Sequence, residues 1–325
     1  MMHAPLVTDK PRKDLPMSEI ELPSVAFLGI GLMGAPMAAR LLAAGYRVTV
    51  WNRSITKTDP LVKLGARRAT TPGEAVRDAS IVIMMLDSGP VVANVVRSAV
   101  LTAAPGKLWI DMSSTAQSEA VALAALLRQH GQAFADAPVS GGVIGAEHGT
   151  LAIMVGGSIE DFKRAESLLQ VLGRPTRVGP VGCGQLTKLC NQLIVGATIG
   201  IVAEALLLAQ AGGADPAAMR SAIRGGFAES RILEVHGQRM LERNFIPGGQ
   251  VKSQSKDFDN VLRAAADSGL NLPIAELVSA IFHDLTATLP TADHAAALLA
   301  LEARNPGKRV GDAPDRLPVN QERPV

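Results

Sequence analysis

The chain has 325 residues, of which 47% are hydrophobic, and this is enough to bury a sizeable core in one large or two smaller domains. Its 32 lysines and arginines nearly balance 30 aspartates and glutamates, and only 3% of its residues are aromatic. Such a chain is not disordered, and it has neither the field that holds a polyanion nor many rings to stack on bases, so we expect no nucleic-acid partner.

The segment before the first predicted strand, residues 1–23, mixes charges and prolines and contains no apolar run typical of a secretion signal. We expect it to be a mobile tail. A second mobile tail is expected at residues 304–325, where proline and charge are again frequent.

Short apolar runs in the first half of the chain predict strands. They are Val25–Leu28, Val48–Trp51, Ile81–Met85 and Leu108–Ile110. Because the runs are apolar throughout rather than alternating, both faces of the sheet should be covered.

Predicted helices lie between and after these strands, at residues 37–44, 72–78 and 116–130. A strand at Leu151–Val155 and a helix at Ile159–Leu172 extend the series. Alternating strands and helices predict a parallel sheet with right-handed crossovers, which we place in an α/β domain at residues 24–183.

The loop Gly29–Gly34 has the spacing G-x-G-x-x-G. The spacing alone is weak in a chain with 31 glycines, but here it follows a strand and opens a helix, which is typical of a dinucleotide site. Gly29 permits a tight turn, Gly31 lets the backbone approach a pyrophosphate, and Gly34 lets the helix pack on the strand. The free N–H groups of the helix then face the phosphates.

The second strand is followed by Asn52, Arg53 and Ser54, where an NAD-selective site would carry an acidic residue. A guanidinium can stack on adenine and bind a 2′-phosphate, which a carboxylate would repel. The sequence therefore favours NADP(H), with NAD(H) possible.

After Gly184 the pattern is helical, with no convincing strand, and it predicts an all-helical domain at residues 184–303. One long apolar helix from about Gln185 to Ala211 should enter it. Glu204 interrupts the most apolar stretch, so we expect a buried helix, no membrane partner and a cytoplasmic protein. Cys183 and Cys190 would lie two turns apart, too far for a disulfide, and no metal site is expected.

Several separate motifs resemble those of the β-hydroxyacid dehydrogenase family, and the similarity runs from Val25 to Glu302. The motifs are Phe27–Gly34, Asp111–Ser114, Asp136–Gly142, Gly184–Gln192 and Lys256–Asp257. The resemblance implies a Rossmann-type α/β dinucleotide-binding domain followed by an all-α C-terminal domain, joined by a long interdomain helix.

Lys188 is the expected catalytic residue. It opens a run without charge from Leu189 to Ala203, and a lysine at the start of a buried helix needs an explanation. An ammonium near a substrate carbonyl can polarise it and give its proton as hydride arrives. Asn191 and Gln192 share its helical face: Asn191 would orient the reacting oxygen or be a buried amide, and Gln192 would contact substrate.

Ser140, Gly141 and Gly142 offer a hydroxyl and successive backbone N–H groups that can cradle a small carboxylate, although a plain glycine turn would look the same. The full set of expected cofactor contacts is Gly29, Gly31, Leu32, Met33, Gly34, Asn52, Arg53, Ser54, Leu86, Ser114 and Lys256.

Two of these residues, Ser114 and Lys256, each have two possible roles. Ser114 would touch nicotinamide or cap the helix beginning at Ala116, and Lys256 would contact cofactor or be a surface lysine. His236 is expected to be structural, because Lys188 already supplies the proton. Glu229, where relatives tend to carry a small residue, would disfavour an anionic substrate if it faced the site.

The residues and the resemblance together predict an NADPH-dependent reductase of a small 3-oxo acid that carries a carboxylate. The alternatives are a dehydrogenase of 3-hydroxyisobutyrate or L-threonate and, in another class, a dinucleotide-binding scaffold without turnover. The long apolar helix also predicts a homo-dimer or homo-tetramer.

Overall fold

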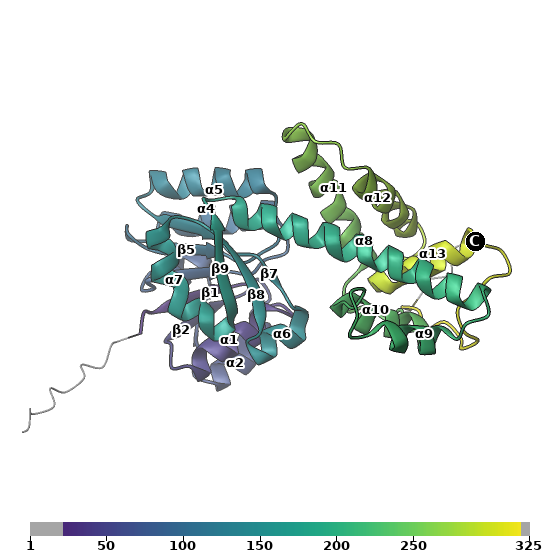
Figure 1. The fold of residues 1–325 in the computed structure, drawn as a ribbon. Helices are drawn as coiled ribbons and strands as arrows, with labels where there is room; N and C mark the ends of the chain where they lie inside the picture. Colours follow the sequence, from purple (N-terminus) through teal and green to yellow (C-terminus); the bar gives the residue numbers. More distant parts are fainter. Residues whose placement is uncertain (1–21, 320–325) are drawn as a thin grey trace, which may run out of the picture.

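A nine-stranded sheet forms the first part of the chain in the computed structural model, which describes residues 22–319 (Figure 1). Its strands are β1 (Val25–Leu28), β2 (Val48–Trp51), β3 (Arg67–Arg68), β4 (Ile81–Met84), β5 (Leu108–Asp111), β6 (Ala133–Asp136), β7 (Val139–Ser140), β8 (Leu151–Gly156) and β9 (Gly173–Gly179). The order is β3-β2-β1-β4-β5-β6-β8-β7, with β9 paired to β8.

The expectation of a parallel sheet is right for the first six strands and wrong beyond them. Strands β1 to β6 pair in parallel, whereas β8 is antiparallel to both β6 and β7, and β9 runs parallel to β8. Strand β8 reverses direction because the short helix α6 (Gly142–His148) connects the end of β7 directly to the start of β8, its neighbour in the sheet. Strand β7 keeps the direction of β6, so the carboxyl ends of β1, β4, β5, β6 and β7 point the same way.

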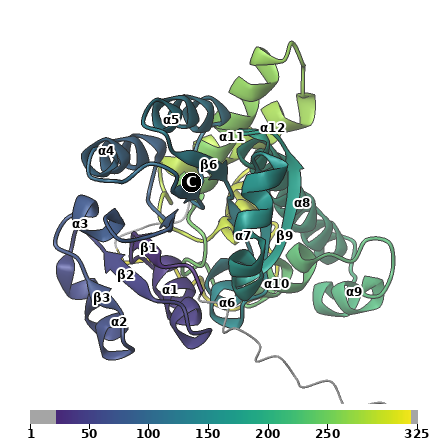
Figure 2. The ribbon, with the colours of Figure 1, turned by 90° about the vertical axis from the view of Figure 1, so that its left-hand side faces the viewer.

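Helices cover both faces of the sheet, as the uniformly apolar strands predict (Figure 2). On one face α1 (Gly34–Ala43) and α7 (Ile159–Leu172) pack on Val25 and Phe27. On the other, α3 (Pro72–Val76), α4 (Gly89–Val100) and α5 (Gln117–Gln129) pack on Ala26 and Leu28. Alternate residues of one strand therefore serve two cores. The short helices η1 (Ile55–Thr58) and α2 (Asp59–Lys63) precede β3.

A single helix, α8 (Cys183–Ala211), runs from the sheet into the second, helical part of the molecule (Figure 1). The other helices there are α9 (Pro216–Ile223), α10 (Arg231–Leu241), α11 (Val251–Asp267), α12 (Pro273–Thr286), η2 (His294–Ala296) and α13 (Ala297–Ala303). Helices α10 to α13 pack around α8, and a Cβ at Gly196 would lie 2.3 Å from a ring carbon of Phe258, so this glycine lets α11 approach closely.

Helix α8 is also, among the described residues, the one helix long and apolar enough to cross a membrane. It packs on β8 at one end and on α10, α11 and α13 further along, and Ile199 and Leu206 lie in the second core. These contacts identify it as a core helix. Both cysteines of α8 are free, as expected.

The closing segment was expected to be mobile from residue 304, and this is wrong as far as Arg316. Val310 is fully buried, and the backbone N–H of Phe245 donates to the carbonyl of Arg316. The buried guanidinium of Arg243 holds the segment by donating to Glu302 at 2.6 and 2.9 Å and to Asp315 at 2.7 Å. The expectations for residues 1–21 and 320–325 lie outside the described residues.

Candidate active site

The Gly29–Gly34 loop leaves β1 with the geometry of a dinucleotide cradle. Gly29 has φ +106°, and a Cβ at this position would lie 2.2 Å from the carbonyl oxygen of Met85. A Cβ on Gly34 would lie 1.9 Å from the carbonyl oxygen of Gly29. At Gly31 a Cβ would meet nothing within 4 Å, so open space lies beside the backbone. No side chain caps the first turn of α1, where the N–H groups of Ala35 and Met37 already donate to the carbonyls of Gly31 and Met33. The backbone N–H groups that face a phosphate are therefore those of the segment from Gly31 to Gly34. The loop therefore fits a pyrophosphate.

Leu32 and Met33 lie in this loop, and Leu32 is 84% exposed. Beyond β2, the Asn52 side chain accepts from the N–H of Ile30 at 3.0 Å and donates to the carbonyl of Ser54 at 2.9 Å. Asn52 thus shapes the loop with its side chain. Arg53 and Ser54 are exposed at the carboxyl end of β2, where a ribose would lie.

The loops after β4 and β5 are joined to each other. The N–H of Leu86 donates to the Ser113 hydroxyl at 2.9 Å, and a Cβ on Gly29 would lie 2.9 Å from Leu86 Cδ2. Leu86 therefore borders the glycine loop. Ser114 follows Ser113 and does not cap α5, because the cap residue is Ala116, whose N–H donates to Glu119 at 2.8 Å. Of the two roles considered for Ser114, helix capping is wrong.

Asp136, at the end of β6, fixes the start of α8. Its two carboxylate oxygens accept from the N–H groups of Gly182 at 2.7 Å and Gln185 at 2.8 Å. The buried Gln185 side chain accepts from the N–H of Thr115 at 3.0 Å and donates to the carbonyl of Ser113 at 2.7 Å. Four hydrogen bonds therefore place α8 against the carboxyl edge of the sheet, next to the loop that carries Ser114.

Lys188 stands one turn inside α8 and begins a line of polar side chains. Its ammonium donates to Gln192 Oε1 at 2.9 Å, and the Asn191 amide donates to the same oxygen at 2.9 Å. The Gln192 amide nitrogen donates onward to Asp257 Oδ2 at 2.7 Å. The structure thus brings Lys188, Asn191 and Gln192 together as their spacing predicted, and it adds Asp257, from α11.

Burial shifts the pKa values at both ends of this line. It lowers the pKa of Lys188, against the opposing effect of the Asp257 charge, and it raises the pKa of Asp257 above its usual range. A lysine with a lowered pKa releases its proton more readily near neutral pH, which suits a proton donor.

Ser140 ends β7, and Gly141 and Gly142 follow with φ +138° and +63°. At Gly142 a Cβ would meet nothing within 4 Å, so its backbone borders open space. Ser140 pairs with Ala152 of β8, the strand on which α8 packs. The segment therefore belongs to the same side of the sheet as the start of α8.

Three other residues named from the sequence lie outside the hydrogen-bonded line. Lys256 is exposed on α11 beside Asp257. His236 lies 3.3 Å from Asp293 and stacks on His294, in a cluster within the helical part. The Glu229 carboxylate accepts from the N–H of Gly225 at 2.6 Å, so it is engaged in its own loop.

Family models match almost the whole described chain. Residues 24–186 match the NAD-binding domain of 6-phosphogluconate dehydrogenase, and residues 182–301 match the NAD-binding domain of NADP-dependent 3-hydroxyisobutyrate dehydrogenase. The two matches meet at the start of α8.

The 2-hydroxy-3-oxopropionate reductase of Escherichia coli is 40% identical over 283 residues, which cover 86% of this chain and 97% of that protein. Among solved structures, Mycobacterium tuberculosis 3-hydroxyisobutyrate dehydrogenase with L-serine superposes with a TM-score of 0.79 at 30% identity, covering 86% of this chain and 99% of the other. Psf3 in complex with NADP+ and 2-OPP superposes with a TM-score of 0.77 at 26% identity, covering 85% and 99%.

Proposed function

This chain belongs to the β-hydroxyacid dehydrogenase family, and from that premise we propose that it reduces tartronate semialdehyde (2-hydroxy-3-oxopropionate) to glycerate with NADPH. It is an NAD(P)-dependent oxidoreductase of 3-hydroxy acids. The observation that carries the proposed mechanism is the position of Lys188. This half-buried lysine lies on α8, which Asp136 anchors at the sheet edge, and it is hydrogen-bonded through Gln192 to Asp257 of α11.

Lys188 is the proton donor in this proposal. The bound reduced nicotinamide would supply the hydride to the aldehyde carbon. The Lys188 ammonium would hydrogen-bond the aldehyde oxygen and protonate it as negative charge develops there. Asn191, whose amide lies beside Lys188 on the same oxygen of Gln192, would orient the reacting oxygen, and Gln192 would hold both donors in position.

Ser140, Gly141 and Gly142 would bind the substrate carboxylate through the hydroxyl and the backbone N–H groups. The open space at Gly142 supports this role. A substrate with a carboxylate and a nearby aldehyde satisfies both this segment and Lys188. The similarity to the Escherichia coli reductase across 97% of its length favours tartronate semialdehyde within that class.

Oxidation of 3-hydroxyisobutyrate is the second candidate. It is favoured by the likeness to the Mycobacterium tuberculosis dehydrogenase, which was solved with L-serine, itself a 3-hydroxy acid. L-threonate is a further member of the same substrate class.

A substrate panel distinguishes these candidates. We expect kcat/KM with NADPH to be highest for tartronate semialdehyde and far lower for glycolaldehyde, which has the aldehyde but lacks the carboxylate. Equal efficiency with glycolaldehyde would rule out the carboxylate role of Ser140, Gly141 and Gly142. A higher kcat/KM for 3-hydroxyisobutyrate or L-threonate in the oxidative direction would replace the proposed substrate.

The preference for NADPH is assigned to Arg53, exposed at the end of β2. Arg53→Asp should weaken NADPH binding by about 2 kcal/mol, because a charge-assisted contact is lost and repulsion is added. NADH binding should be unchanged or stronger. Titration of both cofactors tests this, with Lys57→Asp as a matched control on the adjacent exposed segment. Equal weakening of NADPH and NADH would show that Arg53 does not lie at the ribose.

We propose a homo-dimer or homo-tetramer that works without a membrane, in the cytoplasm. Along α8, Ile194, Ile201 and Leu208 recur every seven residues and are 65%, 64% and 74% exposed, a stripe that a second copy would cover. Sedimentation should give an oligomer mass, and replacing Ile201 with Glu should reduce it. A monomer at every concentration would contradict this.

A further inference from the structure

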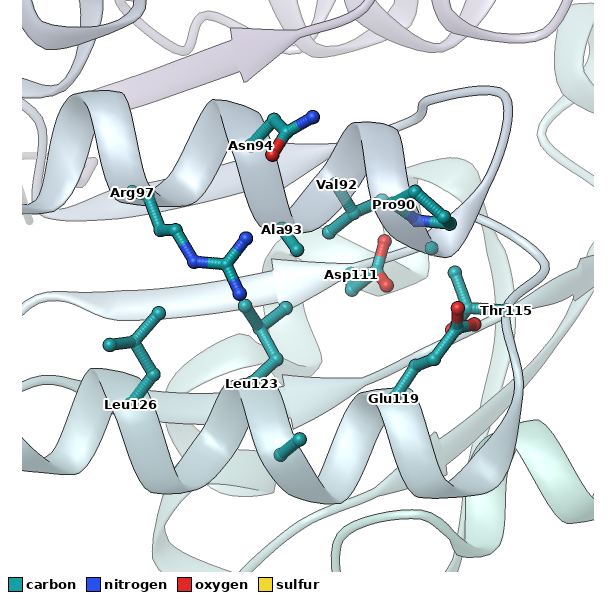
Figure 3. A pocket seen from close by; sticks show the side chains of 12 residues that line it. Pro90, Val92, Ala93, Asn94, Arg97, Asp111, Thr115, Glu119, Leu123 and Leu126 are labelled. Atoms are coloured by element: carbon teal, nitrogen blue, oxygen red, sulfur yellow. The ribbon is translucent and has the colours of Figure 1, made fainter.

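A groove runs between α4 and α5, on the face of the sheet opposite α1 and α7 (Figure 3). Its volume is about 360 Å³, which is in the range of small-molecule sites. Val92 and Leu123 form apolar walls, and Asp111 and Thr115 lie at its buried end. None of its lining residues belongs to the expected catalytic, substrate or cofactor set.

Two buried oxygens in this groove have no hydrogen-bond partner among the described residues. They are Asp111 Oδ2 and Thr115 Oγ1, on residues that are 1% and 5% exposed. The other Asp111 oxygen accepts from the N–H of Ser113 at 3.0 Å. Because buried polar atoms are nearly always paired in folded proteins, these two atoms require a partner from outside the chain.

A second carboxylate lies at the same end. Glu119 projects from the first turn of α5 under Gly89, and a Cβ on Gly89 would lie 2.1 Å from its carboxylate. The pKa of Asp111 is raised to about 7, mainly by burial, and the charges of Asp136 and Glu119 contribute to that rise. A cation at this end would relieve both the repulsion and the cost of burying the Asp111 charge.

The other end of the groove is basic. Arg97 lies eight residues after Gly89 on α4, and its guanidinium extends toward Leu123 of α5 (Figure 3). It has no hydrogen bond or ion pair with the described part of the chain. From the helical rise, the distance between the two ends is about 6 to 12 Å, since Leu123 is four residues from Glu119 and Arg97 eight from Gly89.

We propose that this groove binds a small molecule with an ammonium group at one end of a short apolar chain and a carboxylate at the other, the chemistry of an ω-amino acid. The ammonium donates to Asp111, Glu119 and Thr115, the chain lies along Val92 and Leu123, and the carboxylate pairs with Arg97. A chain of about five carbons spans the distance. This inference does not depend on the substrate or cofactor proposed above.

The test is calorimetric titration of the full chain, saturated with NADPH, by three probes of equal length. 6-Aminohexanoate carries both charges, 6-hydroxyhexanoate lacks the ammonium, and hexylamine lacks the carboxylate. We expect 6-aminohexanoate to bind at least about tenfold more tightly than either, because each loses a charge-assisted contact.

Two variants locate the binding. Asp111→Asn keeps the shape and removes the charge, and it should weaken 6-aminohexanoate at least about tenfold. Ala122→Trp fills the groove from an exposed position of α5 and should abolish binding. Ala125→Trp, one turn further along at an exposed position that does not line this groove, should leave binding unchanged.

The proposal is overturned if 6-hydroxyhexanoate binds as tightly as 6-aminohexanoate, if Ala122→Trp leaves the affinity unchanged, or if none of the probes binds. It is also overturned if 6-aminohexanoate binds the protein without NADPH but not the NADPH-saturated protein, because the groove would then belong to the cofactor site.

Discussion

At the scale of single residues, Gln192 is the link between two groups of opposite charge. Its side-chain oxygen accepts from Lys188 and its side-chain nitrogen donates to Asp257, so the lysine and the carboxylate are coupled through Gln192 without a direct hydrogen bond. The charge of Asp257 raises the pKa of Lys188 and partly offsets the lowering by burial. Asp257 thereby helps keep Lys188 protonated, the form that its proposed role as proton donor requires.

Asp257→Asn should therefore shift the pH dependence of kcat. Without the carboxylate charge the pKa of Lys188 falls further, so the loss of activity on the alkaline side should begin at lower pH. Asp259→Asn, at an exposed position of the same helix, serves as the control and should leave the profile in place. If the alkaline side of the pH profile does not move in Asp257→Asn, Asp257 does not influence the pKa of the proposed proton donor.

Lys188, Asn191 and Gln192 could be predicted from the sequence because a helix places residues three and four apart on one face. The hydrogen bond to Asp257 could not be predicted from spacing, since 65 residues separate it from Gln192. Only the packing of α11 on α8 brings the two side chains together.

At the scale of elements, the start of α8 depends on Asp136. Asp136→Ala would leave the N–H groups of Gly182 and Gln185 buried without their acceptors, and the free energy of unfolding should fall by about 2 kcal/mol or more. Urea denaturation measures this. Asp78→Ala, which removes an exposed ion pair with Arg67, should change little. Equal stability of Asp136→Ala and the unchanged protein would contradict the anchoring role.

Element boundaries followed the sequence where the pattern was strong. Val25–Leu28, Val48–Trp51 and Ile159–Leu172 begin and end where expected, because apolar runs and a serine cap mark them. Helix α4 was not predicted, although Gly89-Pro90 ahead of an apolar run is a usual helix start. Strand β9 reads Gly173–Gly179 and is largely exposed with a proline inside, so no apolar pattern marks it.

At the scale of the whole molecule, buried ion pairs attach the closing segment of the chain to its helical part. Arg243 is fully buried and bonds to Glu302 and Asp315, which ties α10, α13 and the closing segment together. The sequence suggested a mobile tail there because proline and charge usually mark one. It could not show that Asp315 in this segment and Glu302 of α13 share a buried partner, Arg243.

Arg243→Met should lower the free energy of unfolding by about 3 to 5 kcal/mol, because it buries the Glu302 carboxylate without the positive charge of Arg243 beside it. Thermal and urea unfolding measure the loss. Arg304→Met removes an exposed pair with Asp284 and should have a small effect. If both variants lose the same small amount, the closing segment does not hold the helical part together.

In the proposed function, Lys188 gives the proton that completes reduction. The most direct test is the single-turnover and steady-state rate of NADPH oxidation with tartronate semialdehyde by Lys188→Ala. We predict a kcat lower by about 10²-fold or more. NADPH affinity should be nearly unchanged, because the phosphates would be held by the Gly29–Gly34 loop and not by Lys188. A variant that retains near-full kcat would contradict the account.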